Sequence, residues 1–276
     1  PNADGEAPPF DTHARFFTPE GAMAVERAVD RLLADGTPYE LELELVRADG
    51  SRGWMQSRGE PVRDAEGRVS GIHGVAADIT ERKLAGLRVE QLNRLYAALS
   101  ECNWAIVHCA NADELLDRVC EVMVRHGGVD TAWIGRIDPD SGRVTTAFAR
   151  GDGAAEVGDV PASIDPGEPA GRGPVGVAAR ELRPVWIDDL AHSPEASDWL
   201  ALAGRFGWRS AAFLPLVNRR APFAVLALFS TRAGWGDQDT RPLVEQISSN
   251  VNFAVEKLGL APTAPAIGGH PPDTRD

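Results

Sequence analysis

The sequence predicts an α+β protein of two domains, each an antiparallel sheet with helices packed on one face, joined by a long helix. The chain has 276 residues, 43% of them hydrophobic, which is enough for packed cores and exceeds a typical domain of roughly 100–150 residues. Short strand-like runs separated by turn residues occur in both halves of the chain. Between these halves, apolar residues recur every three or four positions, a spacing typical of a long helix.

The charge and cysteine content exclude several classes of protein. The formal net charge is −13 and no basic run is present, so we expect neither nucleic acid nor a membrane surface as partner. No apolar stretch approaches the roughly 20 residues of a membrane span, and no signal peptide opens the chain. Three cysteines, an odd number in a large chain, fit a reducing compartment and predict a cytoplasmic protein.

The first predicted domain covers residues 10–83 and follows a segment, residues 1–9, that is expected to be disordered. Thr18 and Pro19 are typical of a helix start, and Asp35-Gly36 of a helix end. Three strands are then predicted, at residues 39–47, 54–63 and 69–78, with turn residues between them. Alternating Glu and Leu residues in the first strand predict one solvent-exposed face and one buried face.

The connecting helix is predicted over residues 84–109. Its apolar positions have the spacing of a coiled-coil seam and predict a parallel homodimer. The predicted interface residues are Leu84, Leu87, Leu92, Leu95, Leu99, Cys102 and Ile106. The alternative is an amphipathic helix that packs on its own domain, and the spacing alone leaves both possibilities open.

The second predicted domain covers residues 110–260, and the Pro- and Gly-rich residues 261–276 are expected to be disordered. A helix from Asp113 ends at Gly127-Gly128, and a final helix starts near Asp237. Strands are predicted at residues 131–138, 143–150, 184–188, 210–217 and 222–230, with helices at 174–181 and 191–206. This order indicates a single antiparallel sheet with helices on one face and loops on the other.

Residues 37–83 resemble the second half of a PAS domain, its three-stranded part. The residues that carry the resemblance are Asp49-Gly50-Ser51-Arg52-Gly53-Trp54, Asp64-Ala65-Glu66-Gly67-Arg68-Val69, Gly74 and Asp78-Ile79-Thr80-Glu81-Arg82-Lys83. The opening strands and short helices of that family have no room before Phe10. The resemblance therefore implies an incomplete pocket, and it leaves any cofactor unknown.

Residues 92–258 resemble a GAF domain of the sort found upstream of cyclic-di-GMP synthase and phosphodiesterase (GGDEF and EAL) domains. The matching residues include Pro184-Val185-Trp186-Ile187-Asp188-Asp189, Phe206-Gly207-Trp208-Arg209-Ser210-Ala211, Pro215-Leu216 and Asn252-Phe253-Ala254. The resemblance implies a sensory and regulatory module in cyclic-di-GMP signalling. It also implies an output domain that is absent from this chain.

The candidate ligand site lies where the GAF resemblance places its loops, residues 151–172 and 189–209. Tryptophan supplies apolar area and an indole donor, and Asp188 would orient a polar or cationic group. The predicted ligand-binding residues are Trp133, Trp186, Asp188, Trp199, Trp208 and Ser210. In the alternative interpretation these side chains fill the space themselves, and the domain is a dimerisation scaffold without a ligand.

No nucleophile–base pair stands out, so the sequence predicts no catalytic residues and no enzyme activity. Cys102 and Cys120 lie on apolar helix faces, which disfavours the remaining enzyme alternative, a thiol-dependent reductase of GAF fold. Asp188 and Asp189 are adjacent at a strand end and point to opposite faces, so they are not expected to share a metal ion. A cap or turn role for one of them is expected instead.

Overall fold

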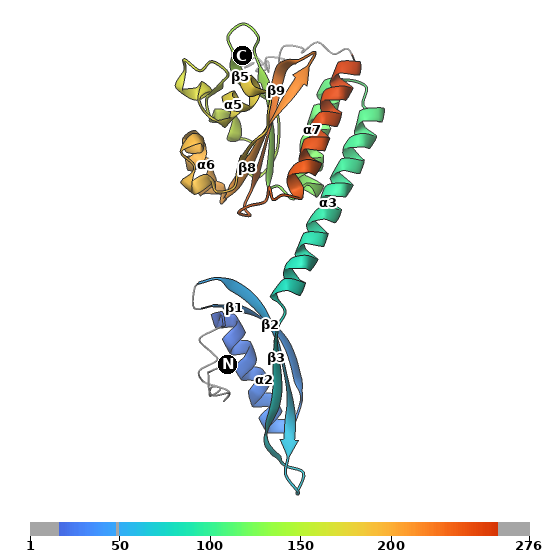
Figure 1. The fold of residues 1–276 in the computed structure, drawn as a ribbon, viewed down its shortest axis with the longest axis vertical. Coiled ribbons are helices and arrows are strands. Elements are labelled where there is room, and N and C mark those ends of the chain that lie inside the picture. The colour runs from blue at the N-terminus through green and yellow to red at the C-terminus, as the bar shows by residue number, and fades with distance from the viewer. Residues whose placement is uncertain (1–16, 48–49, 259–276) are drawn as a thin grey trace, which may run out of the picture. The chain divides into compact units, whose positions relative to one another are not determined.

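The computed structural model describes residues 17–47 and 50–258, so the termini predicted to be disordered lie outside the described residues. Contacts divide the chain into two compact units, one ending at Val89 and the other beginning at Glu90 (Figure 1). We call them unit 1 and unit 2. Both combine helices with antiparallel sheets, which confirms the predicted α+β class.

Unit 1 is a helix on a three-stranded meander, in the order β1-β2-β3 (Figure 1). Its elements are α2 (Pro19–Asp35), β1 (Tyr39–Val46), β2 (Arg52–Arg63) and β3 (Val69–Asp78). The hydroxyl of Thr18 accepts a hydrogen bond from the backbone N–H of Gly21 at 3.2 Å and caps α2, as predicted. Gly36 ends the helix at φ 76°, a conformation that side chains disfavour.

The core of unit 1 is small. Val25 and Val29 of α2 pack with Leu43 of β1, and half-buried side chains such as Tyr39 and Met55 surround them. Most of β3 is exposed. Ile72 and Val75 of β3 are exposed hydrophobic residues, so this sheet keeps apolar surface that its own helix does not cover.

Helix α3 (Thr80–His108) follows β3 after one residue. The side chain of Asp78 accepts a hydrogen bond from the backbone N–H of Thr80 at 2.8 Å, which satisfies a donor of the first helical turn. Among the described residues, no helix is long and apolar enough to cross a membrane.

Unit 2 is built on a six-stranded antiparallel sheet in the order β6-β5-β4-β9-β8-β7. Its strands are β4 (Thr131–Ile137), β5 (Arg143–Gly151), β6 (Ala162–Ser163), β7 (Val185–Ile187), β8 (Ser210–Asn218) and β9 (Ala221–Ser230). The two central strands, β9 and its neighbour β4, are almost entirely buried, so the sheet separates two hydrophobic cores.

Different helices cover the two faces of this sheet (Figure 1). Helices α4 (Ala112–His126) and α7 (Thr240–Lys257) and the second half of α3 share one core with side chains such as Ile134. Helices α5 (Pro174–Glu181) and α6 (Leu200–Phe206), with the loops around them, share the other core with side chains such as Trp133. The prediction placed helices on one face and loops on the other, and the structure adds the short helices α5 and α6 to the loop-covered face.

The structure differs from the prediction at residues 191–206. Only Leu200–Phe206 is α-helical, and short 3-10 helices occupy Leu190–His192 and Pro194–Trp199. Pro194 has no N–H to give to a helix that begins before it, and Ala196 leaves helical geometry at φ −106°. Strand β6, which pairs with β5, is only two residues long and was not predicted.

Candidate functional site

An aromatic cluster fills the loop-covered core of unit 2. Trp199 lies 6.0 Å from Trp133 and 5.0 Å from Phe229, measured between ring centroids, and Trp208 stacks on Phe229 at 4.4 Å. Phe213 lies 5.6 Å from Trp199. All five rings are buried. Trp199 therefore packs against Trp133, Phe213 and Phe229, and Trp208 packs against Phe229, within the loop-covered core in which the ligand was predicted.

Two indole groups of this cluster differ in their hydrogen bonds. Nε1 of Trp133 donates to the hydroxyl of Thr146 at 2.9 Å. Nε1 of Trp208 is buried and has no acceptor among the described residues. Gly153, at φ 82°, lies so close to Trp208 that a Cβ there would be 3.0 Å from its ring. A buried donor without an acceptor is costly, because its bond to water has been lost without replacement.

The other predicted ligand-binding residues do not join this cluster. Trp186 packs on Trp235 with ring centroids 5.9 Å apart, and its Nε1 donates to Glu245 at 3.1 Å. These contacts place Trp186 on the face of the sheet that α7 covers. Its neighbours Val185 and Ile187 point to the other face, as expected for a strand, in which successive side chains alternate. The six predicted residues thus do not line one pocket, although contact of any one of them with a ligand stays a prediction.

Asp188 and Ser210 have structural partners. Both carboxylate oxygens of Asp188 accept hydrogen bonds from Arg241 at 2.9 Å, and this guanidinium also lies 5.3 Å from the ring of Trp186. The hydroxyl of Ser210 donates to the carbonyl of Arg232 at 2.7 Å. Asp189 accepts from the backbone N–H of Ala191 at 3.1 Å, which is the turn role expected for one of the two aspartates.

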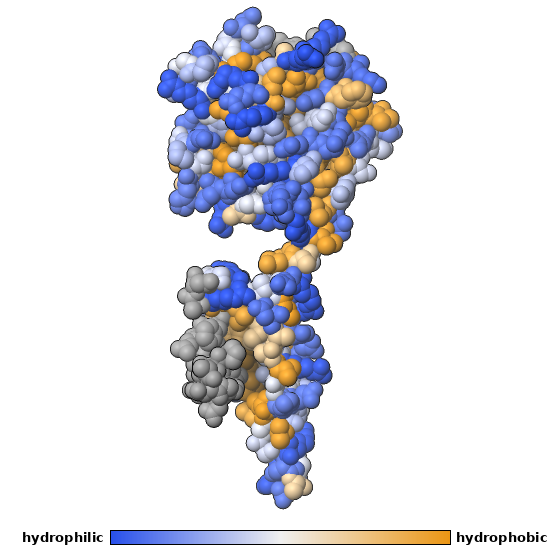
Figure 2. Space-filling view, in the orientation of Figure 1, coloured by the Kyte–Doolittle hydropathy of each residue, from blue (hydrophilic) through white to orange (hydrophobic). Residues whose placement is uncertain are grey.

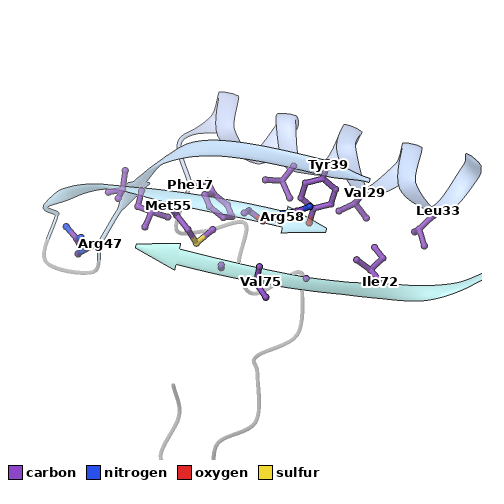
Figure 3. Close-up of a pocket in the computed structure, with 15 residues that line it drawn as sticks. Phe17, Val29, Leu33, Tyr39, Arg47, Met55, Arg58, Ile72 and Val75 are labelled. Atoms are coloured by element: carbon purple, nitrogen blue, oxygen red, sulfur yellow. The ribbon is translucent and has the colours of Figure 1, made fainter. Parts of the chain in front are cut away.

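A second candidate site lies in unit 1, where side chains of α2 and of all three strands line a cavity of about 850 Å³ (Figure 3). Its lining is mostly apolar, with Phe17, Val29 and Met55 on one side and Val75 of β3 on another. This volume falls within the range of small-molecule sites, ~300–1,000 Å³. The sequence predicted an incomplete pocket here, and the apolar residues of β3 were the signal that could have identified the cavity.

Arg47 connects the lining of this cavity to the start of α3. It lines the cavity, and its Nη2 donates to the carboxylate of Asp78 at 3.0 Å and to the hydroxyl of Thr80 at 3.1 Å. Hydrogen bonds from the side chain and backbone of Thr80, followed by the bond from Arg47, lower the pKa of Asp78 to about 2. The carboxylate is therefore ionised at neutral pH and able to keep both partners.

The residues predicted for the dimer interface fall into three groups. Leu84 and Leu87 are each 57% exposed. Leu92, Leu99 and Ile106 are half-buried, the last two against the core of unit 2. Leu95 and Cys102 are fully buried in that core.

This placement corrects the predicted seam. In a single chain, α4, α7 and the sheet already cover Leu95 and Cys102, so these two side chains are not available to a partner chain. Dimerisation itself is a separate question that stays a prediction.

The cysteines do not have the surroundings of reactive thiols. Burial raises the pKa of Cys102 to about 12 and also raises the pKa of Cys109 and Cys120. A thiolate is the nucleophilic form, so a raised pKa opposes thiol chemistry at neutral pH. Among residues 17–47 and 50–258, no group of three or more acidic, His or Cys side chains is arranged to hold a metal ion.

Relatives with known functions match parts of this chain. The bacterioopsin transcriptional activator of Halobacterium salinarum is 24% identical over 236 residues, 80% of this chain and 33% of that protein. The methanogenesis regulatory histidine kinase FilI of Methanothrix harundinacea is 29% identical over 119 residues, 43% of this chain and 13% of that protein. This chain therefore spans a third or less of the length of these relatives.

The fold also matches solved structures. A free methionine-R-sulfoxide reductase from Neisseria meningitidis, solved with its substrate, superposes with a TM-score of 0.50. It is 15% identical, and the match covers 60% of this chain and 92% of that one. At this identity the likeness concerns the fold alone. Residues 4–76 match the family model of the PAS fold and residues 109–256 that of the GAF domain, so the chain belongs to the GAF domain family and carries a PAS fold before its GAF domain.

Proposed function

We propose that this chain is a sensory and regulatory module in which unit 1 binds an apolar small molecule and passes the signal to α3. The cavity of about 850 Å³ that α2 and the sheet line carries this proposal. Apolar side chains on α2, β2 and β3 would bury a hydrophobic ligand, and burial of apolar surface is the main source of affinity in such sites. The two regulatory relatives, a transcriptional activator and a histidine kinase, support a regulatory role.

Arg47 supplies a route from the ligand to the helix. A ligand that contacts or displaces this guanidinium changes its bonds to Asp78 and Thr80, and Thr80 is the first residue of α3. The first turn of α3 is also held to β1, because Arg82 and Lys83 both pair with Glu42. A ligand in the cavity would therefore change how well the first turn of α3 is ordered. Such a change in local order is one way in which a regulatory protein transmits a signal.

The binding test uses anilinonaphthalene sulfonate (ANS), which combines flat apolar rings with an anionic group suited to the arginines of the lining. ANS should raise the melting temperature of the protein, because it binds the folded state. Val75→Asp should weaken ANS binding by about tenfold or more. Val75 is exposed in the free protein and lines the cavity, so a carboxylate there would repel the sulfonate of ANS and would lose water beneath the bound rings. Val62→Asp is the matched control, because Val62 is an exposed strand residue of the same unit outside that lining.

The coupling test uses hydrogen exchange of the backbone amides of residues 80–83. ANS should change their exchange in the native protein, and Arg47→Ala should remove this change while ANS still binds. Binding that is equally strong in Val75→Asp and Val62→Asp would refute the proposed site.

The aromatic cluster of unit 2 supports a second candidate, a ligand of the GAF domain. The buried Nε1 of Trp208 lacks an acceptor among the described residues, and a ligand oxygen would satisfy it. Aromatic carboxylates provide both a flat ring and an acceptor, so they are the compounds to screen by thermal shift. Trp199→Ala should abolish such a shift. A screen without any shift favours the scaffold alternative, in which the packed tryptophans serve only as core.

We further propose that the module works as a homodimer and acts on an output domain outside this chain. A two-fold arrangement would pair equivalent α3 helices, so that a change at Thr80 affects both copies together. The expected link to cyclic-di-GMP signalling and the cytoplasmic location remain part of this proposal. Each is tested in the native host, by expression of the whole protein and assay of its output.

A further inference from the structure

Gln91 lies where α3 becomes attached to unit 2. Before it along the helix, Leu84, Leu87 and Val89 are exposed, and hydrophobic residues are visible along α3 in Figure 2. After it, Leu95 is the first of the fully buried side chains that α3 contributes to the core of unit 2. A movement of the exposed part of the helix therefore reaches the contacts of unit 2 at Gln91.

The side-chain amide of Gln91 is bonded at both of its ends to residues 231–240, the segment that leads from β9 into α7. Its Nε2 donates to the carbonyl of Trp235 at 3.3 Å and to the hydroxyl of Thr240 at 2.5 Å. Its Oε1 accepts a hydrogen bond from Arg232 at 3.1 Å. One side chain thus uses both of its donor hydrogens and an acceptor position on a single segment.

The same segment is anchored to the end of α4. Nε1 of Trp235 donates to the carbonyl of Gly127 at 3.1 Å, and Nη2 of Arg232 donates to the carbonyl of Gly128 at 3.1 Å. Trp235 is fully buried and packs against Trp186 of β7. The two residues that bind Gln91 therefore have fixed positions in unit 2.

The segment also reaches the strand that leads into the loop-covered core. The backbone N–H of Gly234 donates to the carbonyl of Asp188 at 3.2 Å, and Arg241 binds both carboxylate oxygens of Asp188 at 2.9 Å. Asp188 directly follows β7, and two residues later Leu190 is fully buried in the loop-covered core. A shift of residues 189–209 would therefore displace Asp188 and, through the segment, the partners of Gln91.

We propose that Gln91 is a positioning residue that couples α3 to the loop-covered core of unit 2 through residues 231–240. A signal that reaches α3 from unit 1 then changes the order of residues 189–209. A ligand of the loop-covered core changes the hold on α3 in return, because coupling between two sites is reciprocal. This inference rests on the regulatory part of the proposed function and is independent of ligand binding in unit 1.

The test is hydrogen exchange of the backbone amides of residues 92–95 in the whole chain, with no ligand added. Asp188→Asn weakens the bonds to Arg241 and should raise the exchange rates of these amides by about threefold, because the partners of Gln91 become less ordered. Asp189→Asn is the matched control. The carboxylate of Asp189 binds Ala191 and His192 of its own loop, so this variant should leave the rates unchanged.

Gln91→Leu separates coupling from a general loosening of unit 2. It removes all three bonds and should itself raise the exchange rates of residues 92–95 by about tenfold. In this background, Asp188→Asn should have no further effect, since the connection is already broken. Asn93→Leu is the matched control, because Asn93 is an exposed residue of the same helix. In that background, Asp188→Asn should keep its full effect.

Reciprocity gives a second measurement. Gln91→Leu should also raise the exchange rates of the backbone amides of residues 189–192, whereas Asn93→Leu should not. Gln91→Glu keeps the acceptor for Arg232 and loses both donors, so it repeats the test with a side chain of the same shape.

An effect of Asp188→Asn that is equally large in the native and Gln91→Leu backgrounds would overturn this inference. Exchange of residues 92–95 that is unchanged in Asp188→Asn would overturn it as well. The binding of ANS to unit 1 is measured on the same variants and should not change. Failure of the coupling and failure of the proposed ligand site are therefore distinguished.

Discussion

Trp133 and Trp208 lie on the same face of the sheet and are both buried, but their indole groups have different surroundings. The N–H of Trp133 donates to Thr146, whereas the N–H of Trp208 has no acceptor among the described residues. The sequence predicted both residues as ligand contacts. It does not distinguish a tryptophan that packs in the core from one that contacts a ligand. The structure adds that Phe229 packs against both Trp199 and Trp208 and that Phe213 packs against Trp199, while contact of these tryptophans with a ligand stays a prediction.

This difference predicts unequal effects of the same substitution. Trp133→Phe removes a hydrogen bond and should destabilise unit 2 by about 1 kcal/mol more than the loss of ring volume alone. Trp208→Phe loses a similar ring volume but also removes an unsatisfied donor, so it should be less destabilising than Trp133→Phe by about 1–2 kcal/mol. Urea denaturation of both variants measures the difference. Equal losses would mean that Trp208 has an acceptor in solution.

Asp78 predicts a pH dependence at the start of α3. Its pKa is lowered from 3.8 to about 2 in the folded protein, so its ionised form favours folding above pH 3.8. This contribution is lost as the pH falls from about 4 to about 2. In Asp78→Asn, the stability of unit 1 should depend less on pH over this range. Thermal melts at several acidic pH values test the prediction, and an unchanged slope in Asp78→Asn would contradict it.

At the scale of elements, turn chemistry and hydrophobic period predicted nearly all helices and strands, including the ends of α5 and β3. Arg219-Arg220, between β8 and β9, carries no turn signal in the sequence. The structure nevertheless closes this hairpin with both residues at positive φ, 49° and 66°. Likewise, the repeat in α3 predicted an apolar stripe correctly but could not tell burial within the chain from burial between chains.

The strained hairpin predicts a stabilising substitution. A positive φ costs a residue with a side chain about 1 kcal/mol, and glycine has no such cost. Arg220→Gly should therefore stabilise unit 2 by up to about 1 kcal/mol. Gly234→Ala is the reciprocal control, because Gly234 has φ 62° and nothing near its Cβ position, so its loss should destabilise by a similar amount. Opposite signs in denaturation curves are expected, and a loss of stability in Arg220→Gly would contradict the strain.

At the scale of the whole molecule, the two units differ in the size of their cores. Unit 1 has a buried cluster of Val25, Val29 and Leu43 among its described residues. The sheet of unit 2 separates two much larger clusters. Length and the change of pattern after residue 83 predicted two domains, but the relative sizes of their cores depend on which apolar strand faces are covered, and the sequence pattern does not contain that information.

This difference predicts that the chain unfolds in two steps, with unit 1 first. Buried apolar surface is the main stabilising contribution, so the smaller core should melt at the lower urea concentration. Trp54 is the single tryptophan of unit 1, and the other six of the chain belong to unit 2. In Trp54→Phe, the first transition should therefore disappear from tryptophan fluorescence and persist in circular dichroism. Coincident transitions by both probes in the native protein would show that the two units unfold as one.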